Sequence, residues 1–361
     1  MSGSLFRLRN VTLPASGGRQ SPDCDSRDSR SVAKHNQGVN TPRSPGMRLN
    51  SITLEIPSGV TAVVGLSGAG KTSLINVLAG FETGFSGEVT CSASATAAHR
   101  LPLFWVPQSG GLWPHLSAEQ HLDVVDDKAA QDQKTGFESA RFSKRTDEIL
   151  DLFDLIHRRQ ALPAELSQGE RSRLALARAL ATRATVLLLD EPLSHVDPVR
   201  KPTYWNIVRR IVAEENISMV FTSHEPESVL RHAEHVICLD HGSVVFEGPV
   251  RTLYDNPPDA QAGAFLGPLN WFRADEAAAF LTGRVTGTDV AIRPERLQIC
   301  IAGDSGIELV STPFIGAYAE SIVRHAASGM TKSVLHQIPE VAIPVSQRVA
   351  FRESAPTGVA S

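Results

Sequence analysis

Residues 65–72 read Gly65-Leu66-Ser67-Gly68-Ala69-Gly70-Lys71-Thr72, and this stretch decides the fold. It fits the pattern GxxxxGK[ST] and lies between a short apolar run, 59–64, and an amphipathic segment, 71–79. The apolar run is typical of a strand buried on both faces, and the segment after it predicts a helix that ends at Gly80. The glycines let the backbone wrap a phosphate chain with its N–H groups pointing inward. The stretch therefore predicts a phosphate-binding loop, because a chance glycine-rich turn would lack the strand and helix on either side.

The loop also carries side chains suited to a nucleoside triphosphate. We expect Lys71 to reach the β- and γ-phosphates of ATP and the Thr72 hydroxyl to ligate Mg²⁺. The nucleotide-binding residues predicted here are Gly65, Ser67, Gly68, Gly70, Lys71, Thr72 and Ser73.

A second stretch, Val186-Leu187-Leu188-Leu189-Asp190-Glu191-Pro192, is an apolar strand that ends in two carboxylates. Asp190 is predicted to hold Mg²⁺ beside the phosphate loop. Glu191 is predicted to orient and deprotonate a water molecule, which makes it the candidate catalytic base. Alone, such a stretch could equally be a solvated acidic turn; its position downstream of the phosphate loop favours the catalytic interpretation.

Strands alternate with helices through the first two thirds of the chain, which predicts an α/β domain with a largely parallel sheet. The segment 14–47 lacks large apolar residues and is predicted to be a flexible insertion. The segment 116–165 is predicted to be helical. Short β-like segments with Gly and Pro turns follow residue 258 and predict a small all-β domain. The expected elements are strands at 6–13, 47–56, 185–190, 218–222 and 235–239, helices at 169–181, 204–215 and 226–233, and late strands at 290–293, 296–301, 306–310, 321–324, 333–335 and 341–345.

The composition limits the class of protein. A chain of 361 residues fits two domains, and a net charge of −4 gives no basic field for nucleic acid. The four cysteines have no CxxC pairing, which indicates a reducing compartment. There is no apolar run of about eighteen residues and no signal-peptide core, so we expect a cytoplasmic protein whose membrane role would come through partners.

The stretch Leu166-Ser167-Gln168-Gly169-Glu170 makes the sequence resemble a family, the nucleotide-binding subunits of ABC transporters. It is similar to that family's signature loop, and it precedes the Asp-Glu strand as it does there. The resemblance implies that Ser167 and Gly169 contact ATP held by a second subunit. Ser167 and Glu170 also have the spacing of a helix capping box, and both interpretations can hold.

Three more segments match the family in order. Val106-Pro107-Gln108 resembles the Q-loop, which implies that Gln108 contacts Mg²⁺ and nucleotide and couples to the permease. The segment 194–197 resembles the D-loop, so Asp197 is expected at the nucleotide-bearing dimer seam, and His195 is interpreted as structural. The segment 222–225 resembles the switch region, which implies a catalytic hydrogen bond from His224 to the γ-phosphate. The expected adenine-stacking aromatic is missing at 12–16.

The segments 111–117 and 291–295 resemble importers for sugars, polyamines and inorganic ions. The resemblance implies a P-loop NTPase sheet with a helical subdomain over residues 1–258 and an OB-like regulatory domain over 266–361. It implies an ATPase homodimer, or a paired ATPase subunit, on the cytoplasmic face of the membrane. Its partners would be an integral membrane permease and, indirectly, an extracytoplasmic solute-binding protein, with no nucleic acid. An inorganic ion such as iron, molybdate or sulfate is the expected solute.

Two alternatives remain at this level. A soluble ABC-type ATPase acting on nucleic acid, ribosomes or cluster assembly would share the ATP site. The C-terminal domain could also be a ligand-binding module fused for regulation, although it has no ligand-specific motif.

Overall fold

A computed structural model describes residues 4–15, 47–92, 101–126, 139–281, 287–313 and 315–354. The chain forms two compact units, one of residues 1–222 and 239–245, the other of residues 223–238 and 246–361. The predicted insertion 14–47 lies outside the described residues except at its two ends, which belong to strands. Among the helices of the described ranges, none is both long enough and apolar enough to cross a bilayer.

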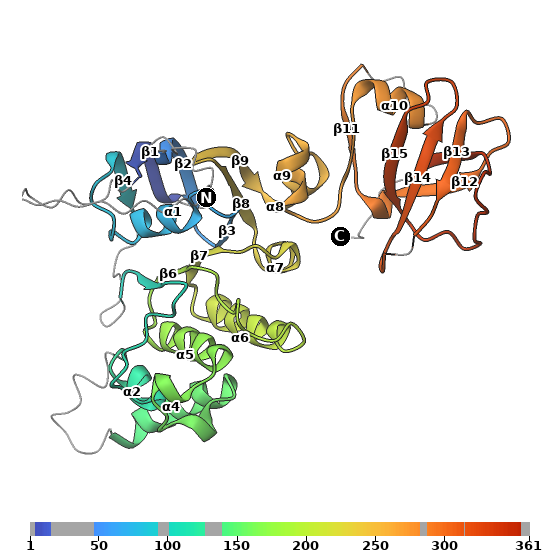
Figure 1. The fold of residues 1–361 in the computed structure, drawn as a ribbon. Coiled ribbons are helices and arrows are strands. Elements are labelled where there is room, and N and C mark those ends of the chain that lie inside the picture. The colour runs from blue at the N-terminus through green and yellow to red at the C-terminus, as the bar shows by residue number, and fades with distance from the viewer. Residues whose placement is uncertain are drawn as a thin grey trace, which may run out of the picture. The chain divides into compact units, whose positions relative to one another are not determined.

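A six-stranded sheet carries the phosphate loop and the acidic strand end (Figure 1). Its order is β5 (Phe104–Val106), β6 (Val186–Leu189), β7 (Ser218–Thr222), β3 (Val60–Gly65), β8 (His235–Asp240) and β9 (Ser243–Pro249). The pairs β5–β6, β6–β7 and β7–β3 are parallel. Every residue of β6 is buried, because helices and neighbouring elements cover both faces of a parallel sheet. The predicted α/β class is confirmed.

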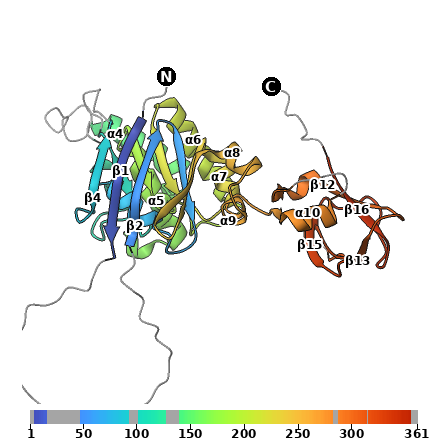
Figure 2. The ribbon, with the colours of Figure 1, turned by 90° about the horizontal axis from the view of Figure 1, so that it is seen from above.

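A separate antiparallel sheet lies beside the first, and sequence reasoning did not predict it. Its strands β2 (Met47–Pro57), β1 (Ser4–Pro14) and β4 (Ser86–Cys91) lie side by side in Figure 2. In β1 and β2 buried and exposed residues largely alternate, because one face packs on the core. The helix α1 (Lys71–Leu78) packs against β2 and β3, which fixes the start of this helix at the end of the phosphate loop.

Four further helices of this unit lie at the lower left of Figure 1. They are α2 (Ala118–Asp123), α4 (Ser139–Leu152), α5 (Gln168–Ala181) and α6 (Lys201–Glu214), with short 3₁₀ turns at Ile156–Arg158 and Pro163–Glu165. Contacts join α2, α4 and α5 to one another, and α5 also contacts α6. The centre of the segment expected to be helical, 127–138, lies outside the described residues.

The second unit begins with helices and continues as β-structure. Its helices are α7 (Pro226–His232), α8 (Val250–Asp255), α9 (Ala260–Ala264) and α10 (Ala274–Phe280). Its strands pair as β10 (Asn270–Phe272) with β11 (Val290–Ile292), β12 (Leu297–Ile301) with β16 (Val349–Glu353), and β13 (Ile307–Ser311), β14 (Ala319–His325) and β15 (Thr331–His336) in one sheet. A core that includes Phe272, Phe280 and Phe351 joins these strands to α10.

One predicted strand, 341–345, is wrong. Val341 and Val345 are 77% and 61% exposed, and the segment has no strand structure. Pro344 has no N–H to donate to a ladder. Pro339, between β15 and this segment, lacks an N–H as well and so prevents β15 from continuing through it. The last strand is β16 instead, where Val349 and Phe351 are buried against the core.

Candidate functional site

Four polar segments meet at one edge of the six-stranded sheet. The parallel strands β5, β6, β7 and β3 are consecutive neighbours, so their carboxyl ends lie together. The residues at those ends are Gln108 after β5, Asp190 and Glu191 after β6, Thr222 at the end of β7, and Gly65 at the end of β3. The topology therefore brings together the phosphate loop, the acidic pair and Gln108, which the sequence placed far apart.

The Thr222 hydroxyl joins the two acidic residues. It donates to Asp190 Oδ1 at 2.7 Å and accepts from the Glu191 backbone N–H at 2.7 Å. Thr222 is fully buried, and Glu191 has a positive φ of 49°. A non-glycine residue in this left-handed region needs support from its surroundings, and the Thr222 hydrogen bond provides it.

Asp190 has one oxygen that remains available. It is 3% exposed, and its Oδ2 atom has no hydrogen-bond partner among the described residues. A buried carboxylate oxygen without a donor is costly unless a cation or a ligand completes it. An oxygen of this kind suits Mg²⁺, which binds one or two protein carboxylates together with phosphate oxygens and water.

Gln108 contacts the candidate base directly. Its side-chain Nε2 donates to Glu191 Oε2 at 2.9 Å. Both side chains reach this contact from the ends of neighbouring strands. The sequence predicted that Gln108 belongs to the site, but it did not predict the hydrogen bond to Glu191.

Lys71 lies folded back into the phosphate loop. Its Nζ donates to the carbonyls of Gly65 at 2.9 Å and Leu66 at 3.1 Å, and the residue is buried. Burial lowers the Lys71 pKa, and the negative charges of Glu191 and Asp190 oppose that shift. The ammonium group therefore lies within the loop. Phosphate oxygens could replace the two carbonyls as the acceptors of its hydrogen bonds.

Two positions of the loop must be glycine because backbone atoms of other segments lie close to them. A Cβ at Gly65 would lie 2.4 Å from the Leu239 carbonyl, and one at Gly70 would lie 2.6 Å from the Arg48 carbonyl. Gly70 also has a φ of 106°, in the region that favours glycine. The remaining predicted residues are the exposed Ser67 and Gly68 in the loop, and the exposed Thr72 and buried Ser73 in the first turn of α1.

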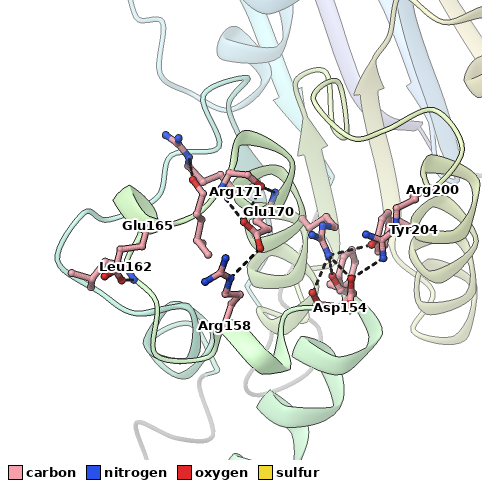
Figure 3. Close-up of polar contacts among 12 residues, drawn as sticks. Asp154, Arg158, Leu162, Glu165, Glu170, Arg171, Arg200 and Tyr204 are labelled. Atoms are coloured by element: carbon pink, nitrogen blue, oxygen red, sulfur yellow. Dashed lines mark hydrogen bonds and ion pairs between the residues drawn. The ribbon is translucent and has the colours of Figure 1, made fainter.

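The segment that resembles the signature loop opens α5 (Figure 3). Ser167 and Glu170 form the predicted capping box: Glu170 N–H donates to Ser167 Oγ at 3.2 Å, and Ser167 N–H donates to Glu170 Oε2 at 2.8 Å. Arg158 donates to the second Glu170 oxygen at 3.2 Å. These bonds hold the Glu170 pKa below its usual value.

Gly169 and the D-loop-like segment are neighbours in space. A Cβ at Gly169 would lie 3.2 Å from the His195 carbonyl. Asp197 is exposed, and its Oδ1 accepts from the Val199 N–H at 2.8 Å, before α6 begins. His224 is exposed and follows β7 by two residues, at the start of the second unit.

Two residues of this region were missed by sequence reasoning. The sequence placed Thr222 only within the switch-like segment 222–225, although a polar residue at the end of a buried strand can indicate a role beside a neighbouring acidic strand. Arg178 is 2% exposed and donates to the carbonyls of Gly110 and Gly111 at 2.8 and 2.7 Å, which holds the chain beyond Gln108. Its place in an amphipathic helix gave no signal for that contact.

Comparisons with known proteins show the family to which the chain belongs. Residues 49–194 match the family model described as ABC transporter. The Fe(3+) ions import ATP-binding protein FbpC 1 of Rhizobium meliloti is 31% identical over 299 residues, which are 77% of this chain and 83% of that protein. The chain belongs to the ABC transporter family.

Other relatives of this ABC transporter chain cover less of it. The Fe(3+) ions import ATP-binding protein FbpC of Yersinia pestis bv. Antiqua is 34% identical over 61% of the chain and 63% of its own length. The Sulfate/thiosulfate import ATP-binding protein CysA of Burkholderia mallei is 34% identical over 62% of the chain and 64% of its own length. The chain thus spans less than two thirds of the length of these two relatives.

Solved structures agree on the fold. The dimeric structure of a bacterial ABC transporter cassette matches with a TM-score of 0.54 and 21% identity, over 68% of this chain and 99% of that one. This likeness confirms the predicted cassette fold.

Proposed function

We propose that this chain is the ATP-hydrolysing subunit of an ABC importer for an inorganic ion. The observation that carries the proposal is the convergence of the phosphate loop, Asp190, Glu191 and Gln108 at one sheet edge. The relatives described above are named as iron and sulfate importers, which supports an inorganic ion as the solute.

In this proposal the loop 65–72 binds the phosphates of ATP. The donors are its backbone N–H groups and the Lys71 ammonium. Asp190, Thr72 and Gln108 are the residues that would hold Mg²⁺, which neutralises charge on the phosphates when bound. His224 is proposed to donate to the γ-phosphate.

Glu191 is proposed as the base that takes a proton from the attacking water. Its backbone is held by Thr222 and its carboxylate by Gln108, so its orientation is set before water arrives. Such positioning lowers the barrier because little reorganisation is left for the reaction itself.

The second half of the site is proposed to come from a second copy of the chain, or from a paired ATPase subunit. Ser167 and Gly169 at the start of α5 would contact ATP across the dimer seam, where Asp197 also lies. The capping box supports this role because it fixes the helix N-terminus that would face the phosphates.

The Lys71→Ala variant tests ATP binding. Removing the ammonium should weaken ATP binding, measured by titration with a fluorescent ATP analogue, at least about tenfold. Lys201→Ala, which truncates a lysine in α6, is the matched control. Unchanged affinity in Lys71→Ala would overturn the phosphate-loop assignment.

Co-purification tests transport. The tagged chain, extracted from host membranes in detergent, should retain an integral membrane permease, and Glu191→Gln should retain it as well. Sedimentation with ribosomes or nucleic acid and no membrane protein would contradict the importer assignment.

A further inference from the structure

The C-terminal unit contains a cavity of about 260 Å³. Ile299 from β12, Ser321 from β14 and His336 from β15 line it, and Ile343 from the segment before β16 forms another wall. That segment is the predicted strand that did not form. Most of the lining is apolar, and none of the described lining residues carries a fixed positive charge.

Three polar side chains in the wall form one hydrogen-bonded chain. His336 Nδ1 lies 2.6 Å from the Gln337 carbonyl oxygen, and His336 Nε2 lies 2.8 Å from Ser321 Oγ. Ser321 Oγ lies 3.0 Å from Thr312 Oγ1. Ser321 and His336 are fully buried, whereas Thr312 is exposed.

The direction of each hydrogen bond follows from the Gln337 carbonyl. A carbonyl only accepts, so His336 Nδ1 must carry a hydrogen. Burial lowers the His336 pKa and keeps the ring neutral, so Nε2 accepts from Ser321. The single Ser321 hydrogen is then committed to His336, and Thr312 must donate its own hydrogen to Ser321.

Among the three side chains of this chain of hydrogen bonds, this order leaves only acceptors for a molecule in the cavity. The free polar positions of the chain are lone pairs on Thr312 and Ser321, and every hydroxyl hydrogen is already used. At these hydroxyl groups an anion would meet lone pairs without a donor or a positive charge. A group with an N–H or O–H hydrogen would complete them.

We propose that this cavity binds a small neutral molecule with an apolar body and one hydrogen-bond donor, such as a phenol, an alcohol or an amide. Apolar walls with a few convergent polar groups are the usual composition of such sites. The inference does not depend on the ATPase function proposed above.

Two probes of similar shape test it on the full chain. Phenol has a donor, and anisole has the same ring with an acceptor only. Titrations are followed through the methyl NMR signals of Ile299 and Ile343, with Ile75 in α1 as the distant control. Phenol should shift the two cavity methyls and bind about fivefold more tightly than anisole, in keeping with one net hydrogen bond.

The Thr312→Val variant tests the end of the chain of hydroxyls. It keeps the side-chain shape at an exposed position, and it should reduce phenol affinity about fivefold while leaving anisole unchanged. Thr331→Val, an exposed change in β15, should leave both affinities unchanged. Equal binding of phenol and anisole, or no binding of either at these methyls, would overturn the proposal. Tighter binding of benzoate than of phenol would also overturn it, because it would show an anion site.

Discussion

The side chains of Gln108 and Glu191 are hydrogen-bonded, with Nε2 of the amide donating to the carboxylate at 2.9 Å. The two residues follow β5 and β6, which pair in parallel with Val106 opposite Leu189. A residue proposed to contact the metal therefore also orients the proposed base, so the two roles are coupled through one side chain.

Gln108→Leu removes the donor and keeps the volume. We expect kcat for ATP hydrolysis to fall about tenfold, because the charged Glu191 carboxylate loses the hydrogen bond that Gln108 donates to it. The measurement is steady-state hydrolysis with a separate binding titration. Gln298→Leu in the C-terminal unit is the control, and an unchanged kcat in Gln108→Leu would show that the contact does not orient the base.

Thr222→Val should destabilise the chain by about 2–4 kcal/mol and reduce hydrolysis, because it removes the hydroxyl that bonds both the buried Asp190 Oδ1 and the Glu191 N–H. Thr222→Ser should restore much of both. Urea unfolding and ATPase assays measure the effect.

Thr61→Val is a matched control for this change. Thr61 lies in β3, next to β7, and it is fully buried with no partner for its Oγ1 among the described residues. Valine should therefore be neutral or stabilising there. Equal losses in the two valine variants would contradict the role given to Thr222.

Gly70→Ala should abolish ATP binding or prevent folding, because its Cβ would meet the Arg48 carbonyl at 2.6 Å. Gly68→Ala meets nothing within 4 Å and should cost only the backbone strain of a positive φ, about 1 kcal/mol. Thermal unfolding and ATP titration of the two variants check this. A similar loss in both would show that strain alone, and not close approach, explains the requirement for glycine.

The Glu170 carboxylate should make α5 sensitive to acid. Its pKa in the folded chain lies below the ordinary value of 4.5, so its stabilisation is fully present above that value and is lost as the pH falls through the folded pKa. Glu170→Gln should therefore cost about 1 kcal/mol near pH 7 and less at pH 3. Urea unfolding at the two pH values measures it, with exposed Glu88→Gln as the control. A penalty that grows toward pH 3 would contradict the assignment.

The parts of the fold that the sequence predicted well have strong local signals. The glycine-rich loop, the apolar run before Asp190 and the Ser167–Glu170 spacing each determine a local structure by themselves. The antiparallel sheet of β1, β2 and β4 was not predicted, because strands so far apart in sequence reveal no pairing. The strand expected at 341–345 did not form, because Pro344 cannot donate to a ladder, although Val341, Ile343 and Val345 alternate.

The residues of the candidate site also differ in whether a local signal in the sequence reveals them. Asp190, Glu191 and Lys71 could be found because their motifs are contiguous. The Thr222 bridge and the Gln108–Glu191 bond depend on strand order, which places β7 between β3 and β6. The Arg178 contact depends on how α5 packs against the chain after β5. The hydrophobic periodicity of the sequence does not predict that packing.

Glu191→Gln tests whether Glu191 is the base in ATP hydrolysis. The change removes the basic oxygen and keeps the size of the side chain, so ATP binding should be retained while turnover falls at least about a hundredfold. The measurement is single-turnover hydrolysis with bound nucleotide quantified in the same sample, and Glu88→Gln is the matched control. Hydrolysis close to that of the unmodified chain in Glu191→Gln would contradict the account, because Glu191 could not then be the base.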